Sequence, residues 1–234
     1  MDRLTSVLQE CRLFRNLPEE VIREIILPMG TLRRFEKRSA VISAQERMDS
    51  FGIVAEGRIQ ILQMFTDGLT SLMGTLRPSY LLGADLICTG NRRAPYCAVA
   101  SSEAQVLFLP AELVLTPGPL PERERLEVCR QLLTFLANEN MRKHYRLAIL
   151  SQRGLRSRIL TYLTMQAGRR GTNSFEIPFS REELADFLCV NRSKLSHELS
   201  RMEQEGLIQF RKNRFTLLAA GENLSTWQSL DEIS

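Results

Sequence analysis

The chain has 234 residues, of which 44% are hydrophobic and 25% charged, and it carries a net charge of +4 at pH 7. This length allows one large domain or two small ones with real cores, and the composition excludes a disordered or low-complexity chain. No stretch reaches the roughly 18 apolar residues of a membrane span, and the start of the chain is typical of an amphipathic helix, not of a signal peptide. We therefore expect a cytoplasmic protein with no membrane partner.

Five cysteines are spread along the chain. Their number is odd and no CxxC pair is present, so the sequence predicts neither a disulfide scaffold nor a zinc ribbon. We expect most of these thiols to be buried as small apolar side chains. The sequence predicts no metal site and no cofactor.

Helical patterns open the chain and β patterns follow. Two helices are predicted early, over about 4–11 and 19–27. From Thr31 to about residue 110 the hydrophobic period changes from near 3.6 to 2, and short β-rich runs alternate with turn signals such as Asp67-Gly68. Gly57 stands in a turn where glycine supplies a positive φ. Short strands at this spacing indicate a sandwich or a barrel.

A long helix is predicted from about Glu122 to Leu150. Apolar residues recur in it at alternating a and d positions over about four heptads, which is typical of a helix that pairs with another helix. Asn140 falls at an a position, where a single Asn can fix register and two-strandedness. The alternative is that this stripe packs on the β-domain of its own chain. We favour a homodimer, with an interface formed by Leu126, Cys129, Leu133, Leu136, Asn140 and Leu147.

Two short helices joined by a tight turn are predicted after residue 180. A helix over about 152–168 and a short strand over 175–179 lead into them. Ser180 with Glu183 forms a capping-box pattern, which begins the first short helix. Asn191 is the cap of the second. An ordinary pair of surface helices would show the same features.

The second short helix has one apolar face and one face of hydrogen-bond donors. A helix about 10–12 Å across fits the major groove of B-DNA, which is about 12 Å wide. Its first turn is the part that reaches the base edges. The apolar face carries Leu195, Leu199 and Met202, and the donor face carries Arg192, Ser193, Ser196 and His197.

A basic hairpin is predicted directly after the second short helix. Gly206 is a C-cap glycine, and strands over about 207–210 and 215–218 enclose the turn Arg211-Lys212-Asn213-Arg214. Charges at such a tip can meet phosphate. Residues 151–218 contain 12 Lys and Arg against 7 Asp and Glu, a modest local excess. The combination is a winged helix-turn-helix, a far narrower pattern than a helix pair.

With the segment LADFLCVNRSKLSHELSRMEQEGLI, the chain resembles the Crp/Fnr superfamily of bacterial transcription regulators, and the likeness covers nearly its whole length. The resemblance implies an α+β fold with three parts. Residues 1–120 are expected to form an effector-sensing jelly roll of the cyclic-nucleotide-binding type, which is a double-stranded β-helix. Residues 121–150 are expected to form a long dimerisation helix, and residues 151–234 a winged helix-turn-helix DNA-binding domain.

The resemblance also implies a function. It predicts a homodimeric, sequence-specific transcription regulator that binds a palindromic operator in double-stranded DNA, acts with RNA polymerase and is not an enzyme. A recognition helix needs a twofold partner to read two half-sites about 34 Å apart. Whether the protein activates or represses is left open.

The resemblance assigns roles at the DNA. Cys189 occupies a turn position that relatives usually give to Gly, and His197 stands where they usually carry Arg. These departures leave the operator sequence open. Arg192, Ser193, Ser196 and His197 are expected to face bases, and Arg181, Lys194, Lys212 and Arg214 to contact the phosphate backbone.

The effector is not identified by the sequence. Relatives that bind a cyclic nucleotide hold its phosphate with a Gly-Glu-Leu turn and a downstream Arg-Ser pair. Here that pair falls on Ala94-Pro95, so we expect no tight cAMP binding. An iron–sulfur cluster of the family's kind needs an N-terminal cysteine trio, and only Cys11 lies there.

We expect an unknown small organic effector instead, and the alternative is that the same residues are ordinary core. The pocket residues are Leu82, Gly83, Ala84, Asp85, Leu86, Tyr96 and Leu133.

Two other classes of protein compete with a DNA-binding regulator. A jelly-roll enzyme of the cupin kind needs a His/Glu metal cluster, and residues 31–110 contain no histidine. A cyclic-nucleotide-binding-like regulatory domain that controls a protein partner would not need a basic wing.

Overall fold

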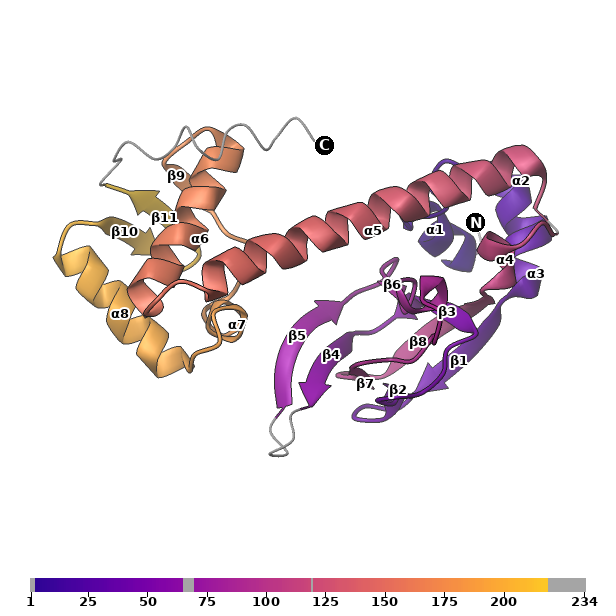
Figure 1. Cartoon of the computed structure of the whole chain (residues 1–234), viewed down its shortest axis with the longest axis horizontal. Coiled ribbons are helices and arrows are strands. Elements are labelled where there is room, and N and C mark those ends of the chain that lie inside the picture. Colours follow the sequence, from indigo (N-terminus) through magenta and orange to yellow (C-terminus); the bar gives the residue numbers. More distant parts are fainter. Residues whose placement is uncertain (1–2, 65–69, 119, 219–234) are drawn as a thin grey trace. The chain divides into compact units, whose positions relative to one another are not determined.

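The computed structural model describes residues 3–64, 70–118 and 120–218, and the turn predicted at Asp67-Gly68 lies outside them. The chain divides into two compact units, residues 1–140 and 141–234, and Figure 1 labels the elements of both. The three-part division at residues 120 and 150 counts the long helix separately and stays a prediction. None of the described helices is long and apolar enough to cross a membrane.

The two helices predicted at the start of the chain are confirmed. The first is α1 (Arg3–Glu10), and the second is built from α2 (Glu19–Val21), the π-turn Ile22–Ile26 and α3 (Leu27–Met29). Pro28 explains the π-turn, because a proline ring clashes with the carbonyl four residues earlier in a regular helix. A wider turn of backbone just before it relieves that clash.

The predicted jelly roll is confirmed as two antiparallel four-stranded sheets (Figure 1). Neighbouring strands along the chain mostly alternate between the sheets, which is the wrapping expected of a double-stranded β-helix. One sheet has the order β1 (Thr31–Phe35), β8 (Ala104–Pro110), β3 (Ser50–Glu56) and β6 (Leu81–Leu82). The other has the order β2 (Ala40–Ile42), β7 (Cys97–Ala100), β4 (Ile59–Met64) and β5 (Thr70–Leu76).

The turn between β3 and β4 depends on Gly57, as the sequence predicts. Its φ is +80°, a conformation that costs little only for glycine. A Cβ at this position would lie 2.1 Å from the carbonyl oxygen of Glu103, in the turn between β7 and β8. The two turns therefore approach each other more closely than any side chain allows.

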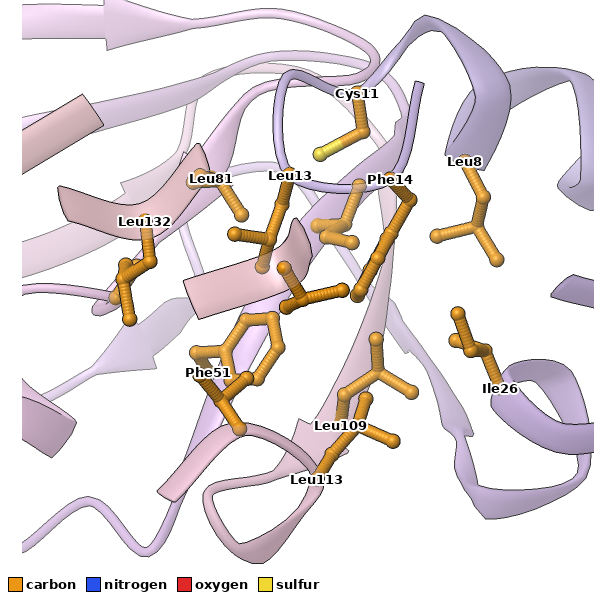
Figure 2. Close-up of a cluster of buried hydrophobic side chains, with 14 of the residues drawn as sticks. Leu8, Cys11, Leu13, Phe14, Ile26, Phe51, Leu81, Leu109, Leu113 and Leu132 are labelled. Atoms are coloured by element: carbon orange, nitrogen blue, oxygen red, sulfur yellow. The ribbon is translucent and has the colours of Figure 1, made fainter. Parts of the chain in front are cut away.

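An apolar cluster joins the N-terminal helices, the first sheet and the long helix α5 (Glu122–Leu150) into one body. Figure 2 shows Phe14 from the N-terminal segment, Phe51 from β3 and Leu132 from α5 meeting in this cluster. Leu113 of the short helix α4 (Glu112–Leu115) closes it. The first part of α5 thus has one face fixed on the β-domain.

The second unit is a winged helix-turn-helix, which confirms that prediction. It contains α6 (Leu155–Arg170), α7 (Arg181–Phe187) and α8 (Arg192–Gln204). The wing consists of β10 (Ile208–Arg211) and β11 (Arg214–Leu217), and β9 (Ser174–Glu176) pairs with β11 as a third strand. Leu195, Leu199 and Met202 of α8 are buried in this unit's core, as predicted.

Gly57→Ala is expected to lower the free energy of unfolding by ~2 kcal/mol or more, because a Cβ adds both a strained φ and an overlap with backbone. Urea unfolding followed by circular dichroism measures this change. Gly74→Ala in β5 is the matched control, since a Cβ there meets nothing within 4 Å and should change stability by less than ~1 kcal/mol. Equal stability of the two variants would contradict the close approach of the two turns.

Candidate nucleic-acid interface

Two side-chain caps set where the helices of the helix-turn-helix begin. Ser180 Oγ accepts from the Glu183 N–H at 3.2 Å, and Glu183 Oε2 accepts from the Ser180 N–H at 2.8 Å. Asn191 Oδ1 accepts from the Lys194 N–H at 2.7 Å. Both predicted caps are confirmed. Because Asn191 ends the turn, Arg192 falls in the first turn of α8, the part of a recognition helix that reaches base edges.

The turn between α7 and α8 contains a strained residue. Cys189 has a φ of +56° and an exposed side chain, so this non-glycine residue occupies the left-handed region, as predicted from its position. The N–H of Val190 donates to the Ala185 carbonyl at 3.0 Å, which closes the end of α7. The hydrogen bond needs this reversal of the backbone, and the strain at Cys189 therefore persists.

Arg156 of α6 forms ion pairs with Glu198 of α8 and with Glu205 at the C-terminal end of that helix. Its Nε lies 2.7 Å from Glu198 Oε1, and its two terminal nitrogens bind the Glu205 carboxylate at 2.6 and 3.0 Å. These hydrogen bonds lower the pKa of Glu205 and raise that of Arg156. The sequence did not predict this ion-pair network, because its partners lie 42 and 49 residues apart and carry no local pattern.

Most of the predicted DNA-facing residues of α8 and of the wing tip are exposed. Arg192, Ser193, Lys194 and His197 are exposed on α8 and Ser196 is half-buried. Lys212 and Arg214 are exposed at the wing tip, where Lys212 has a φ of +57°. Arg181 lies close to Lys212 of the wing and near enough to Arg192 of α8 to feel its charge.

Arg181 differs from the other predicted DNA contacts because it is largely covered. Its guanidinium lies over the rings of Phe210 and Phe215, at 4.8 and 5.9 Å from their centroids. Its Nη2 donates to the Lys212 carbonyl at 3.4 Å. Burial, and then the neighbouring charge of Arg192, lower the pKa of Arg181. Arg181 therefore connects the start of α7, the first turn of α8 and the wing.

In the β-domain, five of the predicted effector residues form one buried turn and Tyr96 faces it. Tyr96 Oη donates to the Asp85 carboxylate, and burial followed by that carboxylate raises the pKa of Tyr96. Leu133 of α5 is 69% exposed. The buried turn consists of Leu82, Gly83, Ala84, Asp85 and Leu86, with Asp85 the least covered.

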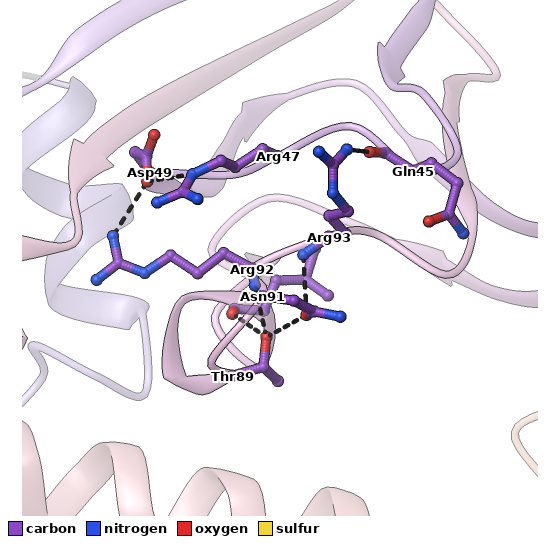
Figure 3. A network of polar contacts seen from close by, with 8 residues as sticks. Gln45, Arg47, Asp49, Thr89, Asn91, Arg92 and Arg93 are labelled. Atoms are coloured by element: carbon purple, nitrogen blue, oxygen red, sulfur yellow. Dashed lines mark hydrogen bonds and ion pairs between the residues drawn. The ribbon is translucent and has the colours of Figure 1, made fainter.

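Arg92 and Arg93, which follow this turn in the sequence, have other partners, as Figure 3 shows. Arg92 Nη1 lies 3.1 Å from Asp49 Oδ1, which also meets Arg47 Nε at 3.4 Å. Arg93 Nη1 donates to the Gln45 carbonyl at 2.7 Å. Ala94, where cyclic-nucleotide binders carry the phosphate-binding arginine, is 0% exposed. These contacts support the expectation of no tight cAMP binding, which stays a prediction.

The predicted dimerisation stripe of α5 divides between two environments. Cys129 and Leu136 pack partly against the apolar cluster of their own β-domain. Leu126, Leu133 and Leu147, spaced at seven or fourteen residues, are 57%, 69% and 65% exposed. The alternative of packing on the chain's own β-domain thus applies to Cys129 and Leu136, while the side chains of Leu126, Leu133 and Leu147 at a positions are exposed.

Cys189→Gly is expected to raise the free energy of unfolding by ~0.5–1 kcal/mol, because glycine removes the left-handed strain at a small cost in chain entropy. Thermal and urea unfolding of the full chain measure this. Cys189→Ala is the control: it keeps a Cβ at positive φ and should change stability by less than ~0.5 kcal/mol. A glycine variant no more stable than the alanine variant would show that the turn is unstrained.

Comparisons with known proteins agree with this architecture. Residues 32–116 match the family model described as cyclic nucleotide-binding domain, and residues 157–221 match that of the Crp-like helix-turn-helix domain. The chain is 23% identical over 198 residues to the transcriptional activator protein FnrL of Cereibacter sphaeroides, which covers 80% of this chain and 75% of the relative. It is 23% identical over 202 residues to the nitrogen fixation regulation protein FixK of Azorhizobium caulinodans, covering 83% and 78%.

Solved structures share the fold. FixK2 from Bradyrhizobium japonicum aligns with a TM-score of 0.52 at 18% identity, covering 86% of this chain and 96% of that one. The c-di-GMP responsive regulator CLP of Xanthomonas campestris aligns with a TM-score of 0.56 at 14% identity, covering 83% and 96%.

Proposed function

The chain belongs to the Crp/Fnr superfamily of bacterial transcription regulators, and we propose that it acts as a homodimer that reads a palindromic operator under the control of an unidentified effector. DNA binding by its helix-turn-helix is the function common to this family. The observation that carries the proposal is the capped start of α8, which presents hydrogen-bond donors beside a basic wing. Its relatives are transcription regulators and not enzymes, and we propose no catalytic activity for this chain.

The proposed base contacts lie on the first two turns of α8. Arg192 suits guanine, whose O6 and N7 accept a bidentate arginine pair. Ser193 and Ser196 can donate to several bases, so they add less discrimination. His197 reaches less far than the arginine that relatives usually carry.

The proposed phosphate contacts surround this helix. Lys194 stands beside the start of α8, whose unpaired N–H groups also favour an anion. Lys212 and Arg214 extend from the wing tip. Phosphate contacts position the protein on the duplex, while base contacts select the sequence.

The dimer proposal rests on the exposed row of α5. Leu126, Leu133 and Leu147 would pair with the same residues of a second chain, with Asn140 between them fixing the register. An exposed leucine row of this spacing is costly in water unless a partner covers it. A parallel pair of α5 helices would also supply the two recognition helices that a palindrome requires.

The effector and the polymerase complete the proposal. A small organic effector would bind at the turn 82–86, where the Asp85 carboxylate accepts a hydrogen bond from Tyr96. Some relatives are named transcriptional activators, which supports activation through RNA polymerase. A cytoplasmic location follows from contact with DNA. A regulatory domain for a protein partner would not account for the capped, basic surface of the second unit.

Arg192→Ala is expected to weaken operator binding by ~1–3 kcal/mol and to relax base preference at one position in each half-site. Gel shifts on an operator selected from genomic fragments, followed by footprinting of single-base variants, measure both effects. Arg201→Ala, on the same helix but outside the proposed contacts, is the control and should keep the base preference. Unchanged affinity and specificity of the Arg192 variant would refute the register proposed for α8.

Leu133→Asp is expected to raise the dissociation constant of the dimer at least tenfold, because two carboxylates would meet at the twofold axis in an apolar row (~1.4 kcal/mol or more). Sedimentation equilibrium measures the change. Thr134→Asp places the same charge on the next residue of α5, away from the row, and should leave the dimer intact. Dimers of equal strength in both variants would place the interface elsewhere.

A further inference from the structure

We propose that Arg181 is a positioning residue that holds the wing against the helix-turn-helix, so that Lys212 and Arg214 reach the phosphate backbone. In this role it acts through the hairpin and not through a phosphate contact of its own. The inference rests on the proposed DNA binding and adds a residue on which the wing's contribution depends.

The stack under the wing is the first observation. Phe210 belongs to β10 and Phe215 to β11, and their rings stack with centroids 5.8 Å apart. The guanidinium of Arg181 covers both rings, at 4.8 and 5.9 Å. A planar cation over an aromatic pair is attracted by both ring faces. Since each strand supplies one ring, Arg181 bridges the hairpin to the start of α7.

The hydrogen bond to the turn is the second observation. Arg181 Nη2 donates to the carbonyl of Lys212, the residue whose φ is +57° at the wing tip. On the other side of the turn, the Asn213 side chain donates to the Ile177 carbonyl at 3.2 Å, and the Ile177 N–H donates to the Asn213 carbonyl at 2.9 Å. The two residues of the turn are thus held from two different segments.

The wing needs such support because of its size. Each of its strands has four residues, and an isolated hairpin of this length is marginally stable in water. Among the strands of residues 3–64, 70–118 and 120–218, β9 pairs with β11, and β10 lies at the edge of the sheet. The Phe210 N–H on this edge donates to Glu203 Oε1 of α8 at 3.2 Å. Arg181 and Glu203 therefore both act on Phe210, from α7 and from α8.

The burial of Arg181 argues against a direct phosphate contact. Its Nη1 is inaccessible to solvent and has no hydrogen-bond partner among the residues that the structure describes. A phosphate oxygen therefore has no access to this atom in the structure. Burial also lowers the pKa of Arg181, as expected for a cation covered by aromatic rings. The exposed cations nearest to it, Arg192 and Lys212, are better placed to meet DNA.

Arg181→Lys separates the two roles because it keeps the charge and removes the planar stack. A lysine would still meet a phosphate as a point charge, so a direct contact predicts near wild-type affinity. Positioning predicts binding about tenfold weaker and a smaller salt dependence, because each phosphate that the wing no longer neutralises takes ~0.9 from the slope of log K against log salt. Gel shifts at several salt concentrations measure both.

Combination with a wing variant sharpens the result. The double variant Lys212→Gln/Arg214→Gln should also weaken binding, and adding Arg181→Lys to it should cost less than about twofold more, because the two charges that Arg181 is proposed to position are then absent. Phe210→Leu, which removes the first ring and keeps Arg181, should reproduce Arg181→Lys. Two outcomes would overturn the proposal. One is that Arg181→Lys weakens binding by the same factor in the double wing variant as in the wild type, and the other is that Arg181→Lys leaves affinity and salt slope unchanged.

Arg170 supplies the matched control. Its guanidinium lies 5.8 Å from the centroid of Phe175 in the same sheet, and its Nη1 donates to the Glu176 carbonyl in β9, on the opposite side of β11 from β10 and Phe210. Arg170→Lys should leave DNA affinity within about twofold of wild type. An equal decrease in both lysine variants would mean that general stability of the domain, not the wing, determines the effect.

Hydrogen exchange in the free protein tests the same idea without DNA. Backbone amides of residues 209–216 should exchange faster in Arg181→Lys and Phe210→Leu than in the wild type, and not in Arg170→Lys. Unaltered exchange would overturn the proposal. If the wild-type protein binds no DNA fragment, the proposed function fails, whereas the exchange experiment still decides whether Arg181 holds the wing.

Discussion

The placement of α8 is the constraint on which the proposed DNA interface depends. Leu195, Leu199 and Met202 are fully buried on one face of this helix, and the Arg156 ion pairs fix its rotation and its far end. Because that face packs into the core, the opposite face of α8 is exposed to solvent. The cap at Asn191 then decides which residues form the first turn. The donors of α8 are therefore presented by packing, and their chemistry determines what the helix can read.

In the β-domain, polar groups at and near the predicted effector turn have partners within the chain. Gly83 of this buried turn has a φ of +73°, and the Asp85 carboxylate two residues later accepts a hydrogen bond from Tyr96. The nearby arginines are held by Asp49 and by a carbonyl of the neighbouring loop.

Local features of the structure were predictable because each depends on residues a few positions apart. The capping box at Ser180 and the turn at Gly57 follow from single-residue conformational preferences. The positive φ at Cys189 opposes the preference of a cysteine, and only the resemblance to a family with glycine at this position indicated it. The pairing of β9 with the wing was not foreseen, since it depends on how segments far apart in the sequence pack. The π-turn before Pro28 was not foreseen either, although its cause is the local clash of the proline ring. The long-range contacts of Arg156 and Arg181 could not be predicted from the sequence, because an arginine in a helix does not indicate which distant carboxylate or aromatic ring it will contact.

The long helix α5 shows most clearly what the sequence determines and what the tertiary structure determines. The amino-acid sequence by itself determined the length of α5, its period of seven and the winged motif near the end of the chain, since these depend on the order of apolar, capping and basic residues. Only the tertiary structure decided which positions of α5 stay open. Cys129 and Leu136 pack partly against the apolar cluster of the β-domain, while Leu126 and Leu133 are exposed to solvent. The reason is geometric: a helix has one face for each neighbour, and the identity of the neighbour is set by the fold, not by the period.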